Sequence, residues 1–471
     1  MFGKQTLAGD PPQLWHFSVH SILAISEKAL EKCFRQAFPI RLGSRLASLF
    51  LILLASQPLA AADYFVTPNG AGKKNASSWE HAAPQSMIEE LVNGTMAGGD
   101  ALRLGSGVYP RFSLSIHQGG EPGRPKTIMG VDRGEGLPLL RGEWDLDRPD
   151  KGSIGLRLKA GVSNLRFVDL QLSHHKVAVS LRPVEKGAEP ASSLTFSRVL
   201  VSHVRHGYYL EDGIDLDFRD CETRRYSKHG FRFEGGCHRV KLIRCVADCS
   251  EGDEEWEKKT ELFPFGFNAT NGGAPQSNFT FEDCVARNNR MPLQKTSYKN
   301  GDGFVIEGGV AEVTLSRCLA WRNQDGGFDL KSPGVSLIDC IAMRNSRGFR
   351  VWNGGSLTNC FSGANGLGLW VNSTELVEVE GSTFYKNRVA ALQTDDRSVA
   401  GIEASNCLFA ENQKVSRKTS RGPVRIEASA IGDDEEPILF QEPNEDWLGD
   451  SSGMDSMSHP ALGYRYPGSS E

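Results

Sequence analysis

The sequence has no excess of basic charge, because 53 Lys and Arg residues stand against 58 Asp and Glu residues, for a formal net charge of −5. A dedicated basic nucleic-acid binder is therefore excluded as the default, and no nucleic-acid partner is expected. The composition of a collagen and the repeat of a coiled coil are also missing. Only one long apolar run is present, near the N-terminus, so no transmembrane segment is expected in the mature chain.

That apolar run has the order of features of an export signal. Arg41 and Arg45 precede an apolar stretch at 47–55, which is too short to span a bilayer in the usual way, and Ala60-Ala61-Ala62 offers a small-residue cleavage site. A buried helix is the alternative. We interpret 1–62 as an N-terminal extension plus signal peptide, which predicts bacterial export of a soluble protein to the periplasm or the medium.

Cysteines are few, and they are not arranged for a disulfide framework. Loss of Cys33 on cleavage leaves nine of the ten cysteines, and an odd number argues against complete pairing. Seven of them occupy the same place in similar short phrases: Cys221, Cys245, Cys284, Cys318, Cys340, Cys360 and Cys407. We expect them to form a ladder of small buried side chains with free thiols.

The cysteine phrases belong to a longer repeat. An Asn often follows five residues after the Cys, then a Gly-aromatic or Gly-aliphatic pair, a short strand and a glycine turn, with a period of 20 to 24 residues. Such a period indicates a solenoid, and the alternation within the strand segments indicates β-strands. The phrase of a leucine-rich repeat, the competing solenoid, is absent. The sequence therefore predicts an all-β fold, a right-handed parallel β-helix (solenoid) of about ten coils between Gly161 and Gln413.

The expected domain limits follow from this repeat. Residues 63–413 form the β-helix domain, with an N-terminal cap at 63–159, and 414–471 form a polar C-terminal cap or tail. Two insertions, at 250–264 and 290–300, interrupt the period just before the Gly-Phe strand. Loops that project from one corner of a solenoid usually wall its binding face, so this face is where we expect the site.

Alternation along the Gly-Phe strand predicts which side chains point outward. If the Phe faces inward, the residues one and three positions later face solvent. These are Arg232, Glu234, Asn268, Thr270, Val305, Glu307, Asp329, Lys331, Arg350, Trp352, Trp370 and Asn372. We expect Trp352 and Trp370, with Glu307 and Arg232, to contact a sugar ligand. The alternative is that the two tryptophans are ordinary exposed aromatics.

Three aspartates should converge at one edge of this face. Asp302, Asp325 and Asp329 come from adjacent coils, and hard oxygen ligands from several loops suit Ca²⁺. In the alternative interpretation, Asp329 forms only a surface ion pair with Arg350 on the next strand, and Asp302 only shapes a turn before a glycine.

At these residues the sequence resembles the ninth polysaccharide-lyase family. The phrases NGDGF, LAWRNQDGGFDL and RNSRGFRVWNGG are similar to motifs of those bacterial β-helix pectate lyases, which cleave polygalacturonate by β-elimination. The resemblance spans roughly 210–413 in repeat style and is specific over about 280–355. It implies that Asp302, Asp325 and Asp329 are Ca²⁺ ligands and that Arg350 stands at the position of the catalytic base.

Two departures from the family pattern affect the chemistry. Gly326 replaces a further aspartate, and Arg350 replaces the family's lysine, although an arginine is effectively always protonated. Lys331 is the other candidate base. We expect an exported, monomeric, Ca²⁺-dependent lyase that cleaves uronate polymers, an acidic polysaccharide of pectate type, by β-elimination. A non-catalytic polysaccharide-binding or surface protein, an alginate-type lyase, and a glycoside hydrolase with Glu307 and Asp329 as its carboxylate pair remain alternatives.

Overall fold

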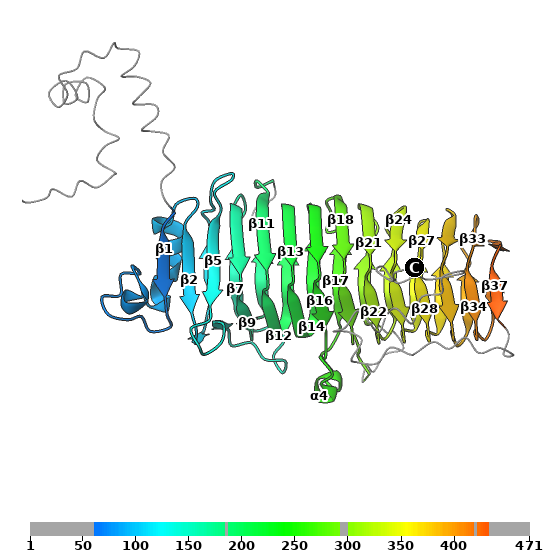
Figure 1. Ribbon diagram of the computed structural model, residues 1–471, viewed down its shortest axis with the longest axis horizontal. Helices are drawn as coiled ribbons and strands as arrows, with labels where there is room; N and C mark the ends of the chain where they lie inside the picture. Colours follow the sequence, from blue (N-terminus) through cyan, green and yellow to red (C-terminus); the bar gives the residue numbers. More distant parts are fainter. Residues whose placement is uncertain (1–60, 184–186, 293–299, 419–421, 433–471) are drawn as a thin grey trace, which may run out of the picture. The chain divides into compact units, whose positions relative to one another are not determined.

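The computed structural model describes residues 61–183, 187–292, 300–418 and 422–432. The export signal predicted within 1–62 and most of the tail predicted at 414–471 lie outside these residues. The described chain from Ala61 onward forms one compact unit of stacked parallel strands (Figure 1). Within the described residues no helix is long and apolar enough to cross a membrane.

The first face of the stack is a 14-stranded parallel sheet in which every strand pairs with the strand of the next coil. Its strands are β1 (Asp63–Val66), β2 (Ala101–Gly105), β5 (Lys126–Val131), β8 (Ser163–Val168), β11 (Ala191–Ser197), β13 (Gly213–Arg219), β15 (His238–Ile243), β18 (Gln276–Glu282), β21 (Val310–Ser316), β24 (Val335–Ile338), β27 (Gly355–Thr358), β30 (Val377–Glu380), β33 (Ile402–Ser405) and β36 (Val424–Glu427).

The second face carries the Gly-Phe strands. It consists of β4 (Leu114–Ile116), β7 (Ile154–Leu158), β10 (Val177–Leu181), the C-terminal parts of β12 (Leu200–Leu210) and β14 (Glu222–Glu234), β17 (Phe265–Thr270), β20 (Asp302–Ile306), β23 (Gly326–Leu330), β26 (Arg347–Val351), β29 (Leu367–Val371), β32 (Ala390–Thr394) and β35 (Ser416–Lys418).

The third face follows the Cys phrases. It consists of β3 (Val108–Pro110), β6 (Leu139–Arg141), β9 (Gln171–Ser173), the N-terminal parts of β12 and β14, β16 (Val246–Asp248), β19 (Val285–Arg287), β22 (Leu319–Trp321), β25 (Ile341–Met343), β28 (Phe361–Gly363), β31 (Thr383–Tyr385), β34 (Leu408–Ala410) and β37 (Ala430–Gly432). Because β12 and β14 run through both faces, the second and third faces form one 23-stranded sheet.

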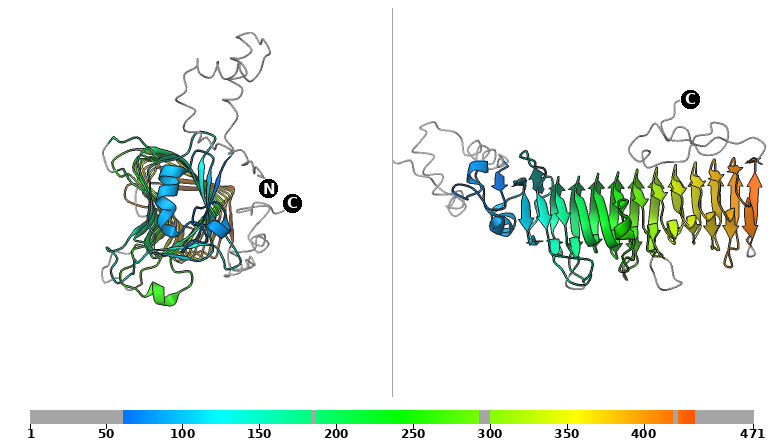
Figure 2. Two further views of the ribbon diagram at one scale, coloured as in Figure 1. Left: turned by 90° about the vertical axis from the view of Figure 1, so that its left-hand side faces the viewer. Right: turned by 90° about the horizontal axis from the view of Figure 1, so that it is seen from below.

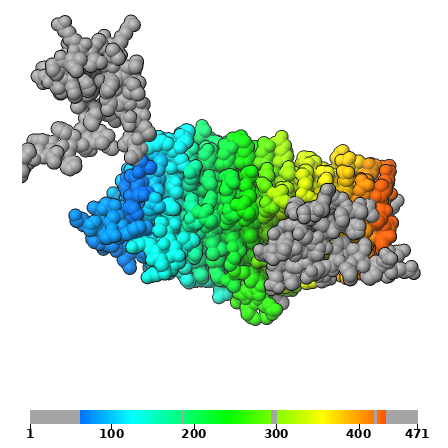
Figure 3. All heavy atoms as spheres, in the orientation of Figure 1, coloured from blue at the N-terminus to red at the C-terminus, as the bar shows by residue number. Residues whose placement is uncertain are grey.

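This arrangement confirms the predicted parallel β-helix. Viewed along the axis of the stack, the strands of successive coils superimpose around a common core (Figure 2), and in the space-filling view the coils follow one another as consecutive bands of colour (Figure 3). Strands β1 to β7 lie before Gly161, so the residues expected to act as a cap already form coils. The short helices η3 (Gln85–Met87), α3 (Ile88–Glu90) and η4 (Leu91–Thr95) follow β1 and bury apolar side chains in the core.

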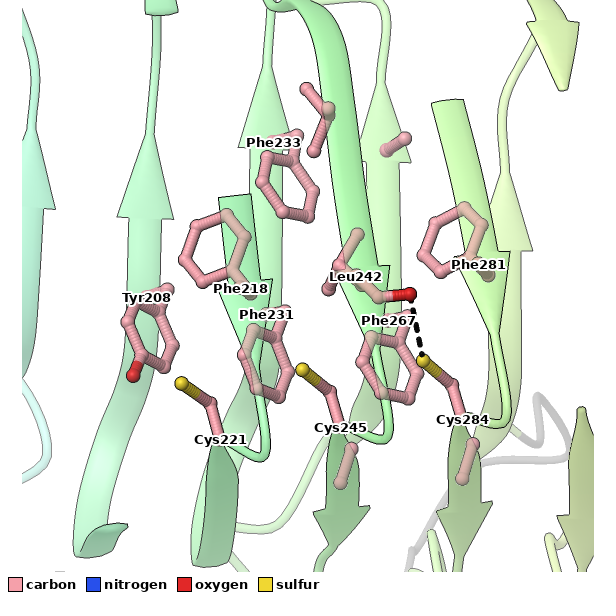
Figure 4. Close-up of a cluster of buried hydrophobic side chains, with 14 of the residues drawn as sticks. Tyr208, Phe218, Cys221, Phe231, Phe233, Leu242, Cys245, Phe267, Phe281 and Cys284 are labelled. Atoms are coloured by element: carbon pink, nitrogen blue, oxygen red, sulfur yellow. Dashed lines mark hydrogen bonds between the residues drawn. The ribbon is translucent and has the colours of Figure 1, made fainter. Parts of the chain in front are cut away.

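Stacked aromatic rings fill the interior along the Gly-Phe strands. The ring centroids of Phe267 and Phe304 lie 4.9 Å apart, and those of Phe304 and Phe328 lie 4.8 Å apart, both in nearly parallel planes. This distance equals the usual spacing of neighbouring strands, because equivalent residues lie directly above one another. Figure 4 shows Phe231 and Phe267 beside the cysteines of the same coils. The inward orientation of the Phe confirms the register on which the site prediction depends.

The predicted cysteine ladder is present. All nine cysteines of the described residues are free and buried, and the thiols of Cys284, Cys340 and Cys360 each donate to carbonyl oxygens of the first face. Ser382 takes the place of a cysteine in its coil, and its hydroxyl accepts from the Cys360 amide at 2.9 Å. The thiols therefore act as small buried side chains and not as disulfide partners.

The asparagines that follow the cysteines form a second ladder, at the turn between the third and second faces. Asn345 is 1% exposed; its Nδ2 donates to Asn365 Oδ1 at 3.1 Å and to the Ala320 carbonyl at 3.1 Å, and its Oδ1 accepts from the Asn323 amide at 2.9 Å. Since a buried amide is costly unless all of its groups are paired, this ladder fixes the turn in each coil. At its N-terminal end the Tyr226 hydroxyl donates to Asn289.

A second apolar cluster lies on the outer side of the third face. Its members, called the outer stripe here, point away from the interior, because their strand neighbours Ala320 and Ala342 belong to the core. The outer stripe consists of Leu319, Trp321, Ile341, Met343, Phe361, Tyr385 and Ala410.

The first insertion forms a projecting loop that includes the short helix α4 (Glu254–Glu257) and leads into β17 (Figure 1). The Asp253 side chain caps this helix by accepting hydrogen bonds from two of its backbone amides. Trp256 of α4 packs edge-on against His203, so the loop is anchored on the turn that precedes the second face. Residues 293–299 of the second insertion lie outside the described chain.

Candidate functional site

The outer side of the second face carries the side chains that the sequence singled out. Strand pairing places Arg232, Asn268, Val305, Asp329, Arg350 and Trp370 in one row, in that order along the stack. A parallel row two residues further along each strand contains Glu234, Thr270, Glu307, Lys331, Trp352 and Asn372. Two groups of interacting polar side chains occur on this face.

The first group, the aspartate cluster, consists of Asp302, Asp325, Asp329, Arg347 and Arg350. The Arg350 guanidinium lies between the three carboxylates, with Nη1 3.0 Å from Asp325 Oδ2 and 3.8 Å from Asp302 Oδ1, and Nε 3.6 Å from Asp329 Oδ1. Arg347 Nη1 lies 2.5 Å from the other oxygen of Asp325. The three aspartates therefore converge as predicted, and an arginine stands in their midst.

Asp302 is the most deeply buried carboxylate of the cluster. It is 2% exposed, and its Oδ1 accepts a hydrogen bond from the Gly326 amide at 2.6 Å. Burial, together with the negative charges of Asp329 and Asp325, raises the pKa of Asp302 to about 8, against the opposing effect of Arg350.

The residues of this cluster do not fit a Ca²⁺ ion. Ca²⁺ takes six to eight oxygen ligands, but the carboxylates here are bound to Arg347 and Arg350, and Asp302 accepts from a backbone amide. Across the described parts of the chain, no group of three or more His, Cys, Asp or Glu side chains is arranged to hold a metal ion. The prediction of a Ca²⁺ site at these three aspartates therefore disagrees with their geometry.

Lys331, one of the two predicted bases, is held in its charged form. Its Nζ lies 2.6 Å from Glu307 Oε1 and 3.4 Å from Asp329 Oδ2. Burial by itself lowers the pKa of Lys331, but the charges of Asp329 and Glu307 outweigh it and raise the pKa above its ordinary value. Since the Arg350 guanidinium is also charged, both predicted bases carry a positive charge next to carboxylates. The Glu307–Asp329 carboxylate pair of the hydrolase alternative is bridged by the same lysine.

The two predicted sugar-stacking tryptophans are packed against each other. Their ring centroids lie 4.7 Å apart with an interplanar angle of 68°, and Arg350 lies 5.4 Å from the Trp352 ring and 5.6 Å from the Trp370 ring. Trp370 is only 7% exposed, and its Nε1 donates to Asp395. The expectation of two exposed aromatics is therefore wrong for Trp370, because the outward residues of adjacent coils cover one another. Trp352 is half-buried and donates to Asp329.

Arg232, the remaining predicted binding residue, lies three strands away from Asp329, roughly 14 Å at the usual strand spacing. It belongs to a second group, the histidine cluster, which consists of His206, His229, Tyr209, Arg232 and Glu234. His206 Nδ1 and His229 Nδ1 lie 2.8 Å apart in adjacent strands, and Arg232 Nη1 lies 3.4 Å from His229 Nε2. The Arg232 guanidinium also pairs with Glu234 at 2.8 Å.

Tyr209 is held between two guanidinium groups. Arg182 lies 4.5 Å and Arg232 4.7 Å from its ring centroid, and its hydroxyl donates a hydrogen bond to Glu234. Burial, followed by the hydrogen bond to Glu234, raises the pKa of Tyr209 to about 12, so the phenol is protonated at neutral pH.

The two histidines of the cluster are neutral at the same pH. Burial, together with the positive charges around them, lowers the pKa of His206 and of His229 well below the ordinary value of 6.5. The surrounding cations are Arg205, Lys228, Lys176 and Arg232. A neutral imidazole pair, a protonated phenol and several cations thus share one patch of the second face.

An unpartnered amide lies next to this cluster. Asn268 stands beside Arg232 in the row, is 4% exposed, and its Oδ1 has no hydrogen-bond partner in the described part of the chain; nor does the buried Nε of Arg232. Buried polar atoms without partners are costly. Within the described residues the Nε atoms of Arg347 and Arg350 in the aspartate cluster also have no hydrogen-bond partner.

Strand alternation predicts the outward positions of Arg232 and Glu234, but the sequence-based prediction did not include His206, His229 and Tyr209. A signal was present: His206-Gly207 and His229-Gly230 precede an inward aromatic in consecutive coils, and the pairing places His229 two strands before Asp302 in the same row. The family resemblance directed attention to the aspartates of that row instead.

No protein-family model matches this chain, and no curated protein does. Among solved structures, pectate lyase Pel9A is similar over 88% of this chain and 92% of its own, at 14% identity and a TM-score of 0.36. The periplasmic alginate epimerase AlgG is similar over 70% and 72%, at 10% identity and 0.38. A mannuronic acid specific polysaccharide family 6 lyase from human gut microbiota is similar over 78% and 83%, at 13% identity and 0.45. These likenesses concern the fold.

Proposed function

We propose that this protein cleaves an acidic polysaccharide that contains uronate by β-elimination, and that the histidine cluster is its catalytic centre. The single observation that carries the proposal is the neutral His206–His229 pair beside the protonated Tyr209 and the Arg232 guanidinium. Elimination needs a base, an acid and a positive charge within reach of one sugar, and this patch holds all three. The export signal expected from the sequence supports action outside the cytoplasm.

The bond changes of the reaction set the role of each group. The base takes the C5 proton of the uronate, the C5–H electron pair forms the C4=C5 double bond, and the bond from C4 to the glycosidic oxygen breaks. The leaving oxygen takes a proton from the acid. The products are an unsaturated uronate and a chain with a new hydroxyl, so no oxidant, reductant or water is consumed.

The histidine pair serves as the base, because a neutral imidazole can accept a proton while a protonated Lys331 or Arg350 cannot. The hydrogen bond between the two rings lets the pair share the proton it receives. Tyr209 serves as the acid, and the tyrosinate that forms is stabilised by the two guanidiniums that face its ring. Arg232 also stabilises the negative charge that develops on the sugar carboxylate, with the unpartnered Asn268 as a hydrogen-bonding neighbour.

The test is incubation of the mature protein with polygalacturonate, polymannuronate and polyguluronate, each in EDTA and in CaCl₂, followed by absorbance of unsaturated uronates. We expect product from at least one polymer, and we expect the rate to fall 10²- to 10⁴-fold, the usual size of a general acid–base contribution, in His206→Gln. Arg350→Lys is the matched variant outside the proposed centre and should keep its product. Product from none of these polymers, or full activity of His206→Gln, would overturn the proposal.

A second candidate function is binding of an acidic polysaccharide without cleavage. The aspartate cluster favours it, since its carboxylates and guanidiniums neutralise one another and leave no base there. This candidate predicts retention of the polymer on affinity electrophoresis with no unsaturated product, and loss of retention in Arg232→Ala. The same assay therefore separates the two functions.

A further inference from the structure

We infer that the guanidinium of Arg350 is the resident cation of the aspartate cluster, so that this chain needs no metal ion where the resembled family binds Ca²⁺. Arg350 is the only residue of the cluster that contacts all three aspartates among the described residues, at 3.0, 3.6 and 3.8 Å. A guanidinium offers several N–H donors and a permanent charge, so it satisfies converging carboxylates without deprotonation or exchange.

Packing holds the guanidinium in this place. The Trp352 and Trp370 rings lie beside it, and its side chain is only 14% exposed. Aromatic faces stabilise a guanidinium by cation–π contact, whereas they offer no oxygen to a hard metal ion. The aromatic pair that the sequence suggested as a sugar platform thus selects an organic cation at this position.

Gly326 lies against both Asp302 and Arg350 and leaves no space for a side chain. A Cβ at Gly326 would lie 2.8 Å from Asp302 Oδ1 and 3.3 Å from Arg350 Cδ. A fourth carboxylate there would therefore displace both side chains. The absence of a side chain at Gly326 leaves room for the Arg350 guanidinium. The two departures from the family motif therefore belong together, because an arginine takes the place of a metal ion and one of its carboxylate ligands is missing.

The inference holds whether or not the protein cleaves a polysaccharide, because its test measures metal binding. Terbium(III) substitutes for Ca²⁺ and emits when a nearby tryptophan is excited, and Trp352 and Trp370 are the donors at this cluster. We expect wild type to show no saturable tryptophan-sensitised emission and no shift of its unfolding midpoint with CaCl₂. Arg350→Met should bind terbium at least tenfold more tightly and should gain a Ca²⁺-dependent rise of the midpoint.

Two controls sharpen this experiment. Arg244→Met removes an arginine from the exposed ion pair with Asp220 and should gain no emission. Adding Asp329→Asn to Arg350→Met should abolish the new binding. Saturable emission from wild type that Asp329→Asn removes would overturn the inference, as would a folded Arg350→Met that binds no terbium. Should Arg350→Met not fold, the wild-type titration with and without Asp329→Asn decides the question.

Discussion

His206 and His229 lie in adjacent strands with their Nδ1 atoms 2.8 Å apart, so one ring must carry the proton that the other accepts. The contact connects two adjacent coils of the second face. His229 lies in the same row as Asp302, which is two strands further along the stack. It also couples the protonation of the two rings, since a charge on one opposes a charge on the other.

The first prediction concerns the pH dependence of cleavage. Burial and the neighbouring cations lower the pKa of both histidines, so the pair stays neutral, and able to accept a proton, to a pH below the ordinary value of 6.5. The acid limb of kcat/KM should therefore have its midpoint below pH 6.5. A midpoint at or above that value, in a protein shown by circular dichroism to be folded throughout, would contradict the assignment.

Tyr209→Phe should separate catalysis from packing. The substitution keeps the ring between Arg182 and Arg232 but removes the proton donor. We expect kcat to fall 10²- to 10⁴-fold, as is usual for a lost general acid, with KM changed little. Tyr64→Phe, on the first strand of the chain, is the matched control and should leave both constants unchanged. A rise of KM at constant kcat would instead show that the hydroxyl only binds substrate.

Stability should decline in acid because of His175. This buried imidazole lies 3.0 Å from the Leu140 carbonyl and 3.1 Å from the Ser153 hydroxyl, and burial lowers its pKa to about 4. Because the folded pKa lies below the unfolded one, the contribution is complete above pH 6.5 and is lost as pH falls toward 4. The contribution of His175 to the free energy of unfolding should fall by about 3 kcal/mol over this window. Urea titrations at several pH values should show that the free energy of unfolding falls less steeply with decreasing pH in His175→Gln than in wild type. The exposed His117→Gln should show the same pH dependence as wild type.

Substitution of one asparagine of the ladder should lower the free energy of unfolding. Asn345→Ala leaves the Ala320 carbonyl and the Asn323 amide without this partner inside the turn, whereas Asn365 Oδ1 keeps the backbone amide of residue 345. We expect the free energy of unfolding to fall by about 3 kcal/mol, because each buried unpaired group costs about 1–3 kcal/mol and the turn relaxes in part. Chemical denaturation measures this loss. The exposed Asn353→Ala should change stability by less than about 1 kcal/mol, and equal losses would argue against a structural ladder.

The fold was predictable because its determinants are local and repeated. The spacing of Cys284, Cys318, Cys340 and Cys360 gives the coil length, and the Gly-Phe pairs fix which side chains face inward. Stacking then places equivalent residues above one another without further information. The start of the helix was less predictable, since β1 and β2 carry no such phrase and join the first face only through strand pairing.

The site was predictable in register but not in chemistry. Alternation placed Asp329 and Arg350 correctly on the outer side and in adjacent strands. It did not show that Trp370 would be covered by its neighbour, or that Lys331 would be held charged between Glu307 and Asp329, because both depend on side-chain conformation across coils. The pairing of His206 with His229 likewise needs a shift of register between β12 and β14, since Val204 pairs with Tyr226 but His206 pairs with His229.

The stacked coils also act as a ruler. The distance between the histidine cluster and the aspartate cluster is a whole number of strand spacings, set by the strand β17, which lies between Glu234 on β14 and Asp302 on β20. Removal or duplication of the coil that contains β17 would shift the two clusters by one step of about 4.8 Å and leave each intact. The gain or loss of a coil during evolution can therefore change the spacing of the two clusters along a sugar chain without any substitution within either cluster.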